Sequence, residues 1–158
     1  VLDSRFRGNE RNMSTIHASA VLVGAKAVLI RGPSGAGKSQ LAWQLVNAAA
    51  AQIPFARLVA DDRVHVEARN GRLLVRPAPG LAGLLEIRGL GIRHLAYEPI
   101  AVVGLVVDLA ATDADRLPAH EAGATTVEGI TLPRLAVAAS HTAVPAILAI
   151  LHTAATGD

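Results

Sequence analysis

The segment Gly32-Pro33-Ser34-Gly35-Ala36-Gly37-Lys38-Ser39 decides the fold. It matches G-x-x-x-x-G-K-[ST], the pattern of a loop whose backbone N–H groups surround the phosphates of a nucleotide. In such a loop Lys38 reaches the β- and γ-phosphates, and the hydroxyl of Ser39 binds Mg²⁺. All eight residues are therefore candidate nucleotide-binding residues, and Ser39 is also a candidate metal ligand.

The residues on either side of this loop have the secondary structure that the motif requires. The apolar run 27–31 predicts a buried strand that enters the loop. Apolar residues at helical spacing predict a helix over 38–50 that leaves it. A helix that begins at this point favours anion binding, because its dipole and its free N–H groups attract negative charge. The alternative, a glycine-rich turn without a ligand, is less consistent with this order of strand, loop and helix.

The rest of the chain mixes strand-like and helical segments. Strand-like apolar runs occupy 16–23, 57–60, 64–69, 72–76, 84–88, 100–109 and 129–137, and a terminal helix is expected over 143–155. Asn70-Gly71, between two of these runs, is a strong signal for a tight hairpin. Strands and helices around a phosphate loop favour an α/β fold with α+β character, in which helices flank a sheet that contains the loop.

Composition limits the classes to which this protein can belong. With 158 residues, the chain is long enough for one domain with a substantial core. Hydrophobic residues make up 51% and aromatic ones only 3%, which predicts a core of Ala, Val, Leu and Ile. There is no Cys, so disulfides and thiolate zinc sites are excluded, and a reducing compartment such as the cytoplasm is favoured. A net charge of +2 gives no reason to expect nucleic acid as a partner, and no apolar stretch is long enough to predict a membrane span.

Residues 1–12 are polar and charged and show no pattern of a strand or helix. They precede Met13, the only methionine. We expect them to be a disordered arm or an extension outside the true start, and residues 13–158 to form the P-loop domain. The alternative is a basic docking tail that uses Arg5, Arg7 and Arg11.

Phosphoryl transfer needs acidic groups near the loop. Asp61 and Asp62 directly follow the apolar run 57–60, and ligands of such sheets gather at the carboxyl ends of strands. One carboxylate can hold Mg²⁺ through a water, and the other can accept the proton of an attacking hydroxyl. We assign the metal shell to Asp61 and the general base to Asp62. The alternative is an ordinary solvated turn.

Two further titratable residues stand in strand-like runs. Glu86 lies within an apolar stretch, where a carboxylate needs a partner such as a metal or an arginine, unless alternation directs it to solvent. His17 lies in the first predicted strand, where a single histidine is more often structural than catalytic.

Together these residues resemble the catalytic domain of the bacterial HPr kinase/phosphorylase family, in the short form found in some proteobacteria. Besides the loop, the similarity includes an upstream histidine (His17), the strand and acidic pair of Leu58–Val64, and the segment Asp115-Arg116-Leu117. The most specific match is Leu85-Glu86-Ile87-Arg88-Gly89-Leu90-Gly91-Ile92, which is similar to the signature of the family.

The resemblance implies a kinase that uses ATP and Mg²⁺ to phosphorylate a serine hydroxyl of an HPr-type carrier of the phosphotransferase system, in a regulatory role. It implies an active site that contains His17, Lys38, Asp62 and Arg116. Asp62 would be the base in phosphorylation and the acid in the reverse reaction, and Arg116 would steady the charge of the phosphoryl group. Ser39 and Glu86 would bind Mg²⁺, and the signature, from about Glu86 to His94, would line the site.

The chain departs from the family at three points. Full-length members have an additional N-terminal domain, which we do not expect within these 158 residues. Their loop for phosphorolysis of phosphoserine contains arginine, whereas the corresponding residues 138–143 here contain none. The resemblance therefore supports the kinase reaction and leaves phosphorylase activity unsupported. We expect their C-terminal helical tail to be shortened here, so a homo-oligomer is compatible with the sequence but not required by it.

Two other functions stay open. A small-molecule kinase can use the same loop, but it needs a lid over its acceptor pocket, and no long Arg-rich lid segment is present in the sequence. A sensor that binds ATP and signals without transfer would not need Asp61, Asp62 and Arg116. The presence of all three residues favours a kinase.

Overall fold

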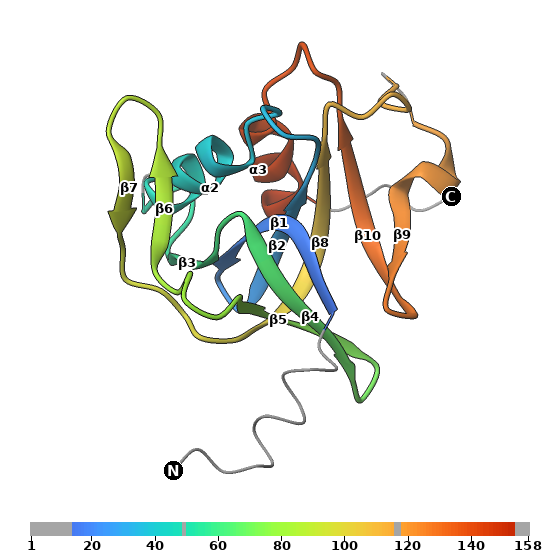
Figure 1. The fold of residues 1–158 in the computed structure, drawn as a ribbon. Coiled ribbons are helices and arrows are strands. Elements are labelled where there is room, and N and C mark those ends of the chain that lie inside the picture. Colours follow the sequence, from blue (N-terminus) through green and yellow to red (C-terminus); the bar gives the residue numbers. More distant parts are fainter. Residues whose placement is uncertain (1–13, 49, 116–117, 154–158) are drawn as a thin grey trace.

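The computed structural model describes residues 14–48, 50–115 and 118–153, and Figure 1 shows how their helices and strands are arranged. The expected N-terminal extension 1–12 and Arg116 lie outside the described residues. The elements follow one another as β1 (Ser14–Val23), β2 (Lys26–Arg31), α2 (Lys38–Val46), β3 (Ala56–Ala60), β4 (Arg63–Arg69), β5 (Arg72–Pro77), β6 (Leu84–Ile87), β7 (Gly91–His94), β8 (Ala101–Leu109), the 3₁₀ helix η1 (His120–Gly123), β9 (Ala124–Val127), β10 (Ile130–Val137) and α3 (Val144–His152).

Within the described residues, eight strands form one sheet, and part of it closes on itself. The strands β2, β1, β4, β5 and β8 pair in that order, and β8 then pairs with β2. Closure is possible because β1 and β8 each change partners along their length. Gly104 is an extra residue in β8 where its register with β2 shifts. A Cβ there would lie 2.8 Å from the Cβ of Lys26, so only glycine fits this close approach.

Several strands around the phosphate loop run in the same direction. β1 is antiparallel to both β2 and β3, so β3 is parallel to β2, and β8 pairs directly with β2 in parallel. Their carboxyl ends therefore meet at one edge of the sheet. The loop after β2 and the acidic pair after β3 lie at this edge, as the sequence predicts for a nucleotide site.

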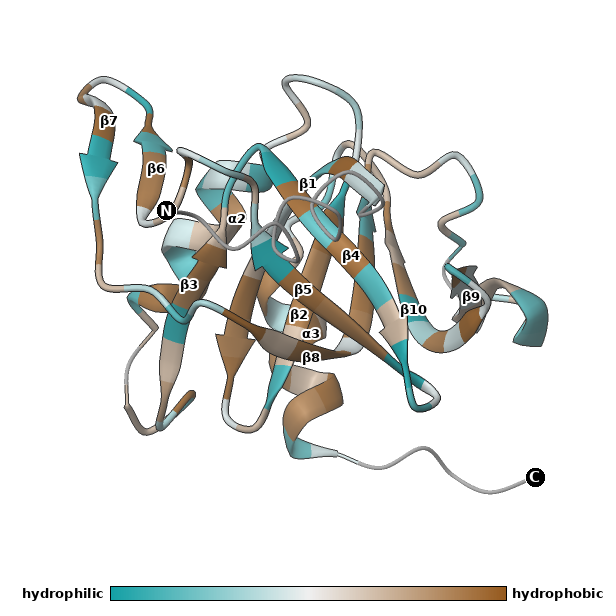
Figure 2. Cartoon of the chain, turned by 60° about the horizontal axis from the view of Figure 1, so that its bottom comes forward, coloured by the Kyte–Doolittle hydropathy of each residue, from teal (hydrophilic) through white to brown (hydrophobic). Residues whose placement is uncertain are grey.

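The core has two parts, one on each face of the sheet. One cluster lies inside the closed strands and includes Leu29, Val66 and Val106. The other lies between the sheet and the helices α2 and α3 and includes Ile30, Leu45 and Ile147. Figure 2 shows the hydrophobic character of the central strands β2, β5 and β8. Among the described residues, the largest fully buried side chains are all Leu, Ile and Val, which confirms the expected aliphatic core.

The hairpin at Asn70-Gly71 is confirmed, since both residues have positive φ (52° and 74°), as a tight turn between twisted strands requires. The helix after the loop is shorter than predicted: it ends at Val46 instead of residue 50. The Asn47 backbone N–H and its side-chain amide both donate to the Trp43 carbonyl, and this cap ends the helix. Likewise, α3 ends at His152, earlier than the predicted 155, and residues 154–155 lie outside the described part.

The strand β7 is absent from the sequence-based expectations. It has four residues, begins with glycine, and is exposed along its whole length, so it lacks the apolar alternation that marks a strand. It forms because it pairs antiparallel with β6. In this register Gly91 lies opposite Ile87, and His94 lies opposite Leu84.

Candidate active site

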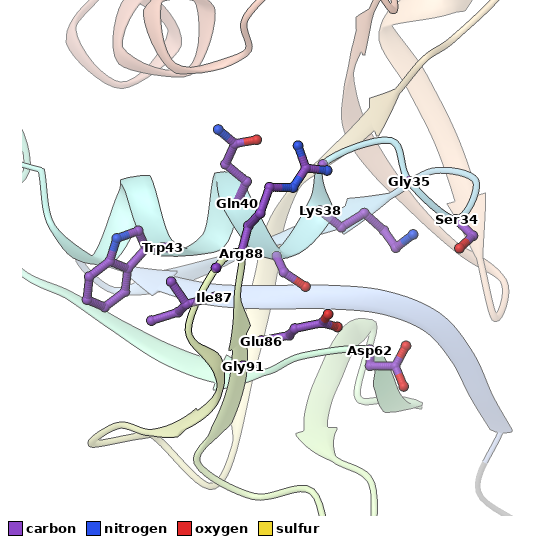
Figure 3. A pocket seen from close by; sticks show the side chains of 13 residues that line it. Ser34, Gly35, Lys38, Gln40, Trp43, Asp62, Glu86, Ile87, Arg88 and Gly91 are labelled. Carbon is purple, nitrogen blue, oxygen red and sulfur yellow. The ribbon is translucent and has the colours of Figure 1, made fainter.

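A cavity of about 650 Å³ lies between the phosphate loop, helix α2 and the turn end of the β6–β7 hairpin (Figure 3). The loop and helix supply Ser34, Gly35, Gly37, Lys38, Ser39, Gln40 and Trp43. The facing side supplies Asp62, Glu86, Ile87, Arg88, Gly89 and Gly91. The volume of the cavity lies in the range of pockets that bind small ligands. The structure thus brings the predicted loop, the predicted base and the predicted metal ligand Glu86 to one cavity.

The conformation of the loop depends on its glycines. Gly35 and Gly37 have φ of 82° and 98°, in the left-handed region that glycine adopts without steric cost. Gly37 is also the N-cap of α2, so the first N–H groups of the helix open toward the loop. The Lys38 ammonium donates to the carbonyls of Gly32 at 2.8 Å and Pro33 at 3.1 Å. It is therefore held across the loop, the region where the motif binds phosphate.

Asp61 lies behind the loop and is almost fully buried, with 5% exposure. Its carboxylate accepts hydrogen bonds from the Ser39 hydroxyl at 2.8 Å and from the Ser19 hydroxyl at 2.6 Å. The backbone N–H of Glu86 donates to it at 3.3 Å. These donors are all neutral, so they do not offset the negative charge of the Asp61 carboxylate. The carboxylate is thus joined directly to Ser39, the hydroxyl that the motif assigns to Mg²⁺.

Asp62 faces the opposite way, into the cavity, and its side chain is 74% exposed. Its backbone has φ of 68°, a conformation that non-glycine residues rarely adopt, and the Arg63 N–H bonds the Asp61 carbonyl across it at 2.8 Å. The two residues thus form a γ-turn with Asp62 at its centre. Such strained turns are frequent at functional sites, where they fix the direction of a side chain.

His17 lies beside Asp62. His17 lies in β1 and pairs with Arg63, the first residue of the neighbouring strand β4, and Asp62 directly precedes Arg63. The Arg63 guanidinium is 3.1 Å from His17 Nε2, and because arginine can only donate, Nε2 accepts and the proton belongs on Nδ1. His17 Nδ1 is 3.9 Å from the Asp62 carboxylate. The single histidine of the first strand therefore contacts the predicted base.

The oxygen ligands at this site suit magnesium bound together with phosphates. The predicted set is Ser39, Asp61 and Glu86, and the Glu86 side chain points into the cavity beside Asp62 (Figure 3). Over residues 14–48, 50–115 and 118–153, no group of three or more His, Cys, Asp or Glu side chains is arranged to hold a metal. Mg²⁺ commonly binds one or two carboxylates and completes its shell with phosphate and water. The residues present fit that mode of binding.

The sequence analysis missed two residues that the site uses. Ser19 is a polar residue in an apolar strand, so the argument applied to Glu86 would have found it. Trp43, the only tryptophan, lines the cavity four residues after Ser39, on the same helix face. The sequence analysis included it only as one position of the predicted helix 38–50.

Another carboxylate near the same edge, Asp108, belongs to a different cluster. It accepts hydrogen bonds from Arg31 at 2.7 and 2.8 Å and from Arg134 at 2.6 Å. Burial alone would raise the pKa of Asp108, but the two guanidinium groups outweigh it and lower the pKa. Arg134 also forms a two-point ion pair with Asp113, and both carboxylates raise the pKa of this arginine. Asp108 is thus neutralised and does not line the cavity.

The comparison with protein families identifies the domain. Residues 11–155 match the model of the HPr Serine kinase C-terminal domain. The chain belongs to this family. The family that the sequence motifs resemble is therefore confirmed.

Known proteins of similar sequence are HPr kinase/phosphorylases. The one from Limosilactobacillus reuteri is 36% identical over 135 residues, which cover 78% of this chain and 40% of that protein. The one from Geobacillus thermodenitrificans is 38% identical over 136 residues, which cover 78% and 42%. The chain therefore spans about two fifths of the length of these relatives.

The HPr kinase fold is also found by structural comparison. The HPr(Ser) kinase/phosphatase from Coxiella burnetii matches with a TM-score of 0.69 and 22% identity, over 87% of this chain and 93% of that one. The match confirms the predicted class of fold, a P-loop sheet with flanking helices. None of the helices in the described part of the chain has the length and apolar character that a membrane crossing requires.

Proposed function

We propose that this chain is the catalytic domain of a protein kinase that transfers the γ-phosphoryl group of ATP to a serine hydroxyl of an HPr-type phosphocarrier protein. The observation that carries the proposal is the opposed orientation of Asp61 and Asp62: one carboxylate is bound to Ser39 behind the loop, and the next faces the cavity. This is the separation of roles that phosphoryl transfer to a hydroxyl requires. The names of the relatives support HPr as the acceptor.

The loop side of the cavity would bind the nucleotide. Lys38 would exchange its two backbone carbonyls for the β- and γ-phosphates, and the N–H groups at the start of α2 would contact phosphate oxygens. Ser39, Asp61 and Glu86 would hold Mg²⁺, directly or through water. When bound, the ion supplies neutralising charge for the phosphates.

The side of the cavity that faces the loop would accept the proton of the serine hydroxyl. Asp62 accepts the proton of the serine hydroxyl while the serine oxygen bonds to the γ-phosphorus and the bond to ADP breaks. The products are phosphoserine, ADP and a protonated Asp62, which returns its proton to solvent. His17, held by Arg63, restricts the direction of the Asp62 carboxylate. We retain Arg116 as a contact of the phosphoryl group on the basis of the resemblance.

The proposed reaction runs in the kinase direction. Residues 138–143 contain no arginine to hold inorganic phosphate, so we do not extend the proposal to phosphorolysis. Because ATP is the proposed donor, we place the activity in the cytoplasm.

A phosphotransfer assay tests the proposal. The chain is incubated with labelled ATP, Mg²⁺ and a bacterial HPr protein, and HPr is analysed by intact mass and by mapping of the modified residue. One added phosphate on a serine supports the kinase. Binding of ATP without transfer to HPr would contradict it and favour the nucleotide sensor, and transfer to a small molecule instead would favour the alternative P-loop kinase.

A further inference from the structure

Trp43, the only tryptophan of the chain, lies on the wall of the cavity and outside the core. Its side chain is 36% exposed, and it belongs to neither core cluster of the described residues. The buried side of α2 is formed instead by Leu41, Ala42 and Leu45. Burial in the core therefore does not explain this large aromatic side chain, and its place on a cavity wall makes it a candidate ligand contact.

The two ends of the cavity differ in their chemistry. Figure 3 shows Ser34, Lys38 and Asp62 toward one end and Trp43 with Ile87 at the other. The first end presents an ammonium, a hydroxyl and a carboxylate, which suit phosphates and the transfer of a proton. The second end presents an indole ring and an aliphatic side chain, which suit a flat group with apolar faces. A nucleotide has both parts, a charged phosphate chain and a flat base.

The order of residues along α2 matches the order of the parts of ATP. Lys38 begins the helix and is the residue that the motif directs to the β- and γ-phosphates, and Ser39 follows it. Trp43 comes four residues after Ser39, so it lies about 6 Å farther along the same face of the helix. In ATP the α-phosphate and the ribose separate the base from the β- and γ-phosphates. A nucleotide that extends along α2 from the loop would therefore bring its base to Trp43.

Ile87 forms the wall beside Trp43. It is the last residue of β6 and packs against the core cluster that lies under α2. Helix α2 and strand β6 are in direct contact, so the positions of the two side chains are fixed by different elements of one packed unit. The apolar end of the cavity is thus bounded by an aromatic ring from the helix and an aliphatic side chain from the strand (Figure 3).

We infer that Trp43 stacks on the base of the bound nucleotide and that Ile87 contacts the base beside it. This inference rests on the proposed function and adds a base subsite to the phosphate site. The loop and Lys38 bind the phosphates, and Trp43 supplies affinity for the base through its aromatic face. The base lies at the end of the cavity away from Asp62, which leaves the γ-phosphate nearest to the proposed general base.

A comparison of ATP with inorganic tripolyphosphate tests the subsite, because tripolyphosphate has the phosphate chain but no base. Calorimetric titration in the presence of Mg²⁺ gives the Kd of each ligand for the wild type, Trp43→Ala and Trp43→Phe. The matched control is Phe55→Ala, which removes another exposed aromatic ring, 41% exposed and outside the cavity. Tryptophan fluorescence gives an independent signal, since Trp43 is the only tryptophan.

For Trp43→Ala we expect the Kd for ATP to rise about tenfold or more, the range that loss of stacking on one base produces, and the Kd for tripolyphosphate to stay unchanged. Trp43→Phe should recover most of the affinity for ATP, because it keeps an aromatic ring. Phe55→Ala should match the wild type for both ligands. In the wild type and in Phe55→Ala, ATP should change the fluorescence of Trp43, and tripolyphosphate should not.

An unchanged Kd for ATP in Trp43→Ala would overturn the inference. So would an equal loss of affinity for ATP and tripolyphosphate, since Trp43 would then act on the shape of the loop and not on the base. The proposed function fails separately: a wild-type chain that binds ATP through Trp43 but does not phosphorylate HPr keeps the subsite and loses the kinase. Normal phosphorylation of HPr with an unchanged Kd for ATP in Trp43→Ala keeps the kinase and removes only the subsite.

Discussion

Asp61 and Asp108 stand at equivalent places in the sheet and have opposite surroundings. Each lies at or near the carboxyl end of a buried strand that is parallel to the P-loop strand β2. Asp61 accepts hydrogen bonds from two serine hydroxyls and a backbone N–H. Asp108 accepts them from two guanidinium groups. An apolar strand followed by aspartate therefore does not by itself indicate a metal site.

The difference lies in the charge of the donors. Hydroxyl and amide donors stabilise the Asp61 carboxylate without cancelling its charge, so it can still attract a cation. Arg31 and Arg134 cancel the charge of Asp108 and join three strands, β2, β8 and β10, in one ionic cluster. We therefore expect substitutions near Asp61 to affect activity and substitutions near Asp108 to affect stability.

The largest effect is expected at Asp62, the cavity-facing partner of Asp61. Asp62→Ala should lower kcat for transfer to HPr by about 10²- to 10⁴-fold, because a general base contributes that much, and should leave ATP affinity unchanged. The measurement is phosphotransfer alongside an ATP titration. Asp113→Ala, which removes an exposed carboxylate outside the cavity, is the control. Normal transfer by the Asp62 variant would show that the base is misassigned.

In the ionic cluster around Asp108, the substitution Asp108→Ala should lower the free energy of unfolding by about 2–4 kcal/mol. It would leave two partly buried guanidinium groups without their shared carboxylate, and breaking such pairs is costly. Denaturant unfolding would give this value, and an ATP titration should show unchanged affinity. A stable Asp108 variant that fails to bind ATP would mean that this carboxylate, like Asp61, serves the nucleotide site.

A smaller effect is expected for Asp61→Asn. The amide keeps the size of the side chain but loses its charge, so the affinity for Mg²⁺ in the presence of ATP should fall about 10- to 100-fold, as for other groups that orient metal ligands. Mg²⁺ titration of the transfer rate measures it. Because the donors are two hydroxyls and one N–H, stability should change less than in Asp108→Ala. The reverse order of stability losses would contradict the comparison.

The smallest effect concerns pH. The pKa of Asp108 is lowered in the folded state, so this group contributes stability above the unfolded value of about 3.9 and loses it as the pH falls through the folded pKa. Between pH 5 and pH 3, the stability of the wild type should therefore fall more steeply than that of Asp108→Asn. Unfolding curves at several pH values in this range test it, and parallel slopes for the two proteins would exclude the cluster as the cause.

Local patterns in the sequence singled out several of the residues that the structure brings to the cavity. The phosphate loop, the strand and helix around it, and the Asn70-Gly71 hairpin each depend on residues within a few positions of one another. The same holds for Asp61 and Asp62 as a pair, because their place after a short apolar strand sets them at the edge of the sheet. Arg116 was assigned by resemblance alone, and its position lies outside the described residues.

The sequence by itself determined the chemical groups available to this domain: a loop with the phosphate-binding motif, paired carboxylates and an aliphatic core. Only the tertiary structure decided which groups meet. Ser19 reaches Asp61 across 42 positions, and Arg31 reaches Asp108 across 77. His17 lies beside Asp62 through the register of β1 and β4, and β7 exists only through its pairing with β6. The contacts of Ser19, Arg31 and His17 join segments far apart in the chain, and strand pairing and register, which no local pattern encodes, bring them together.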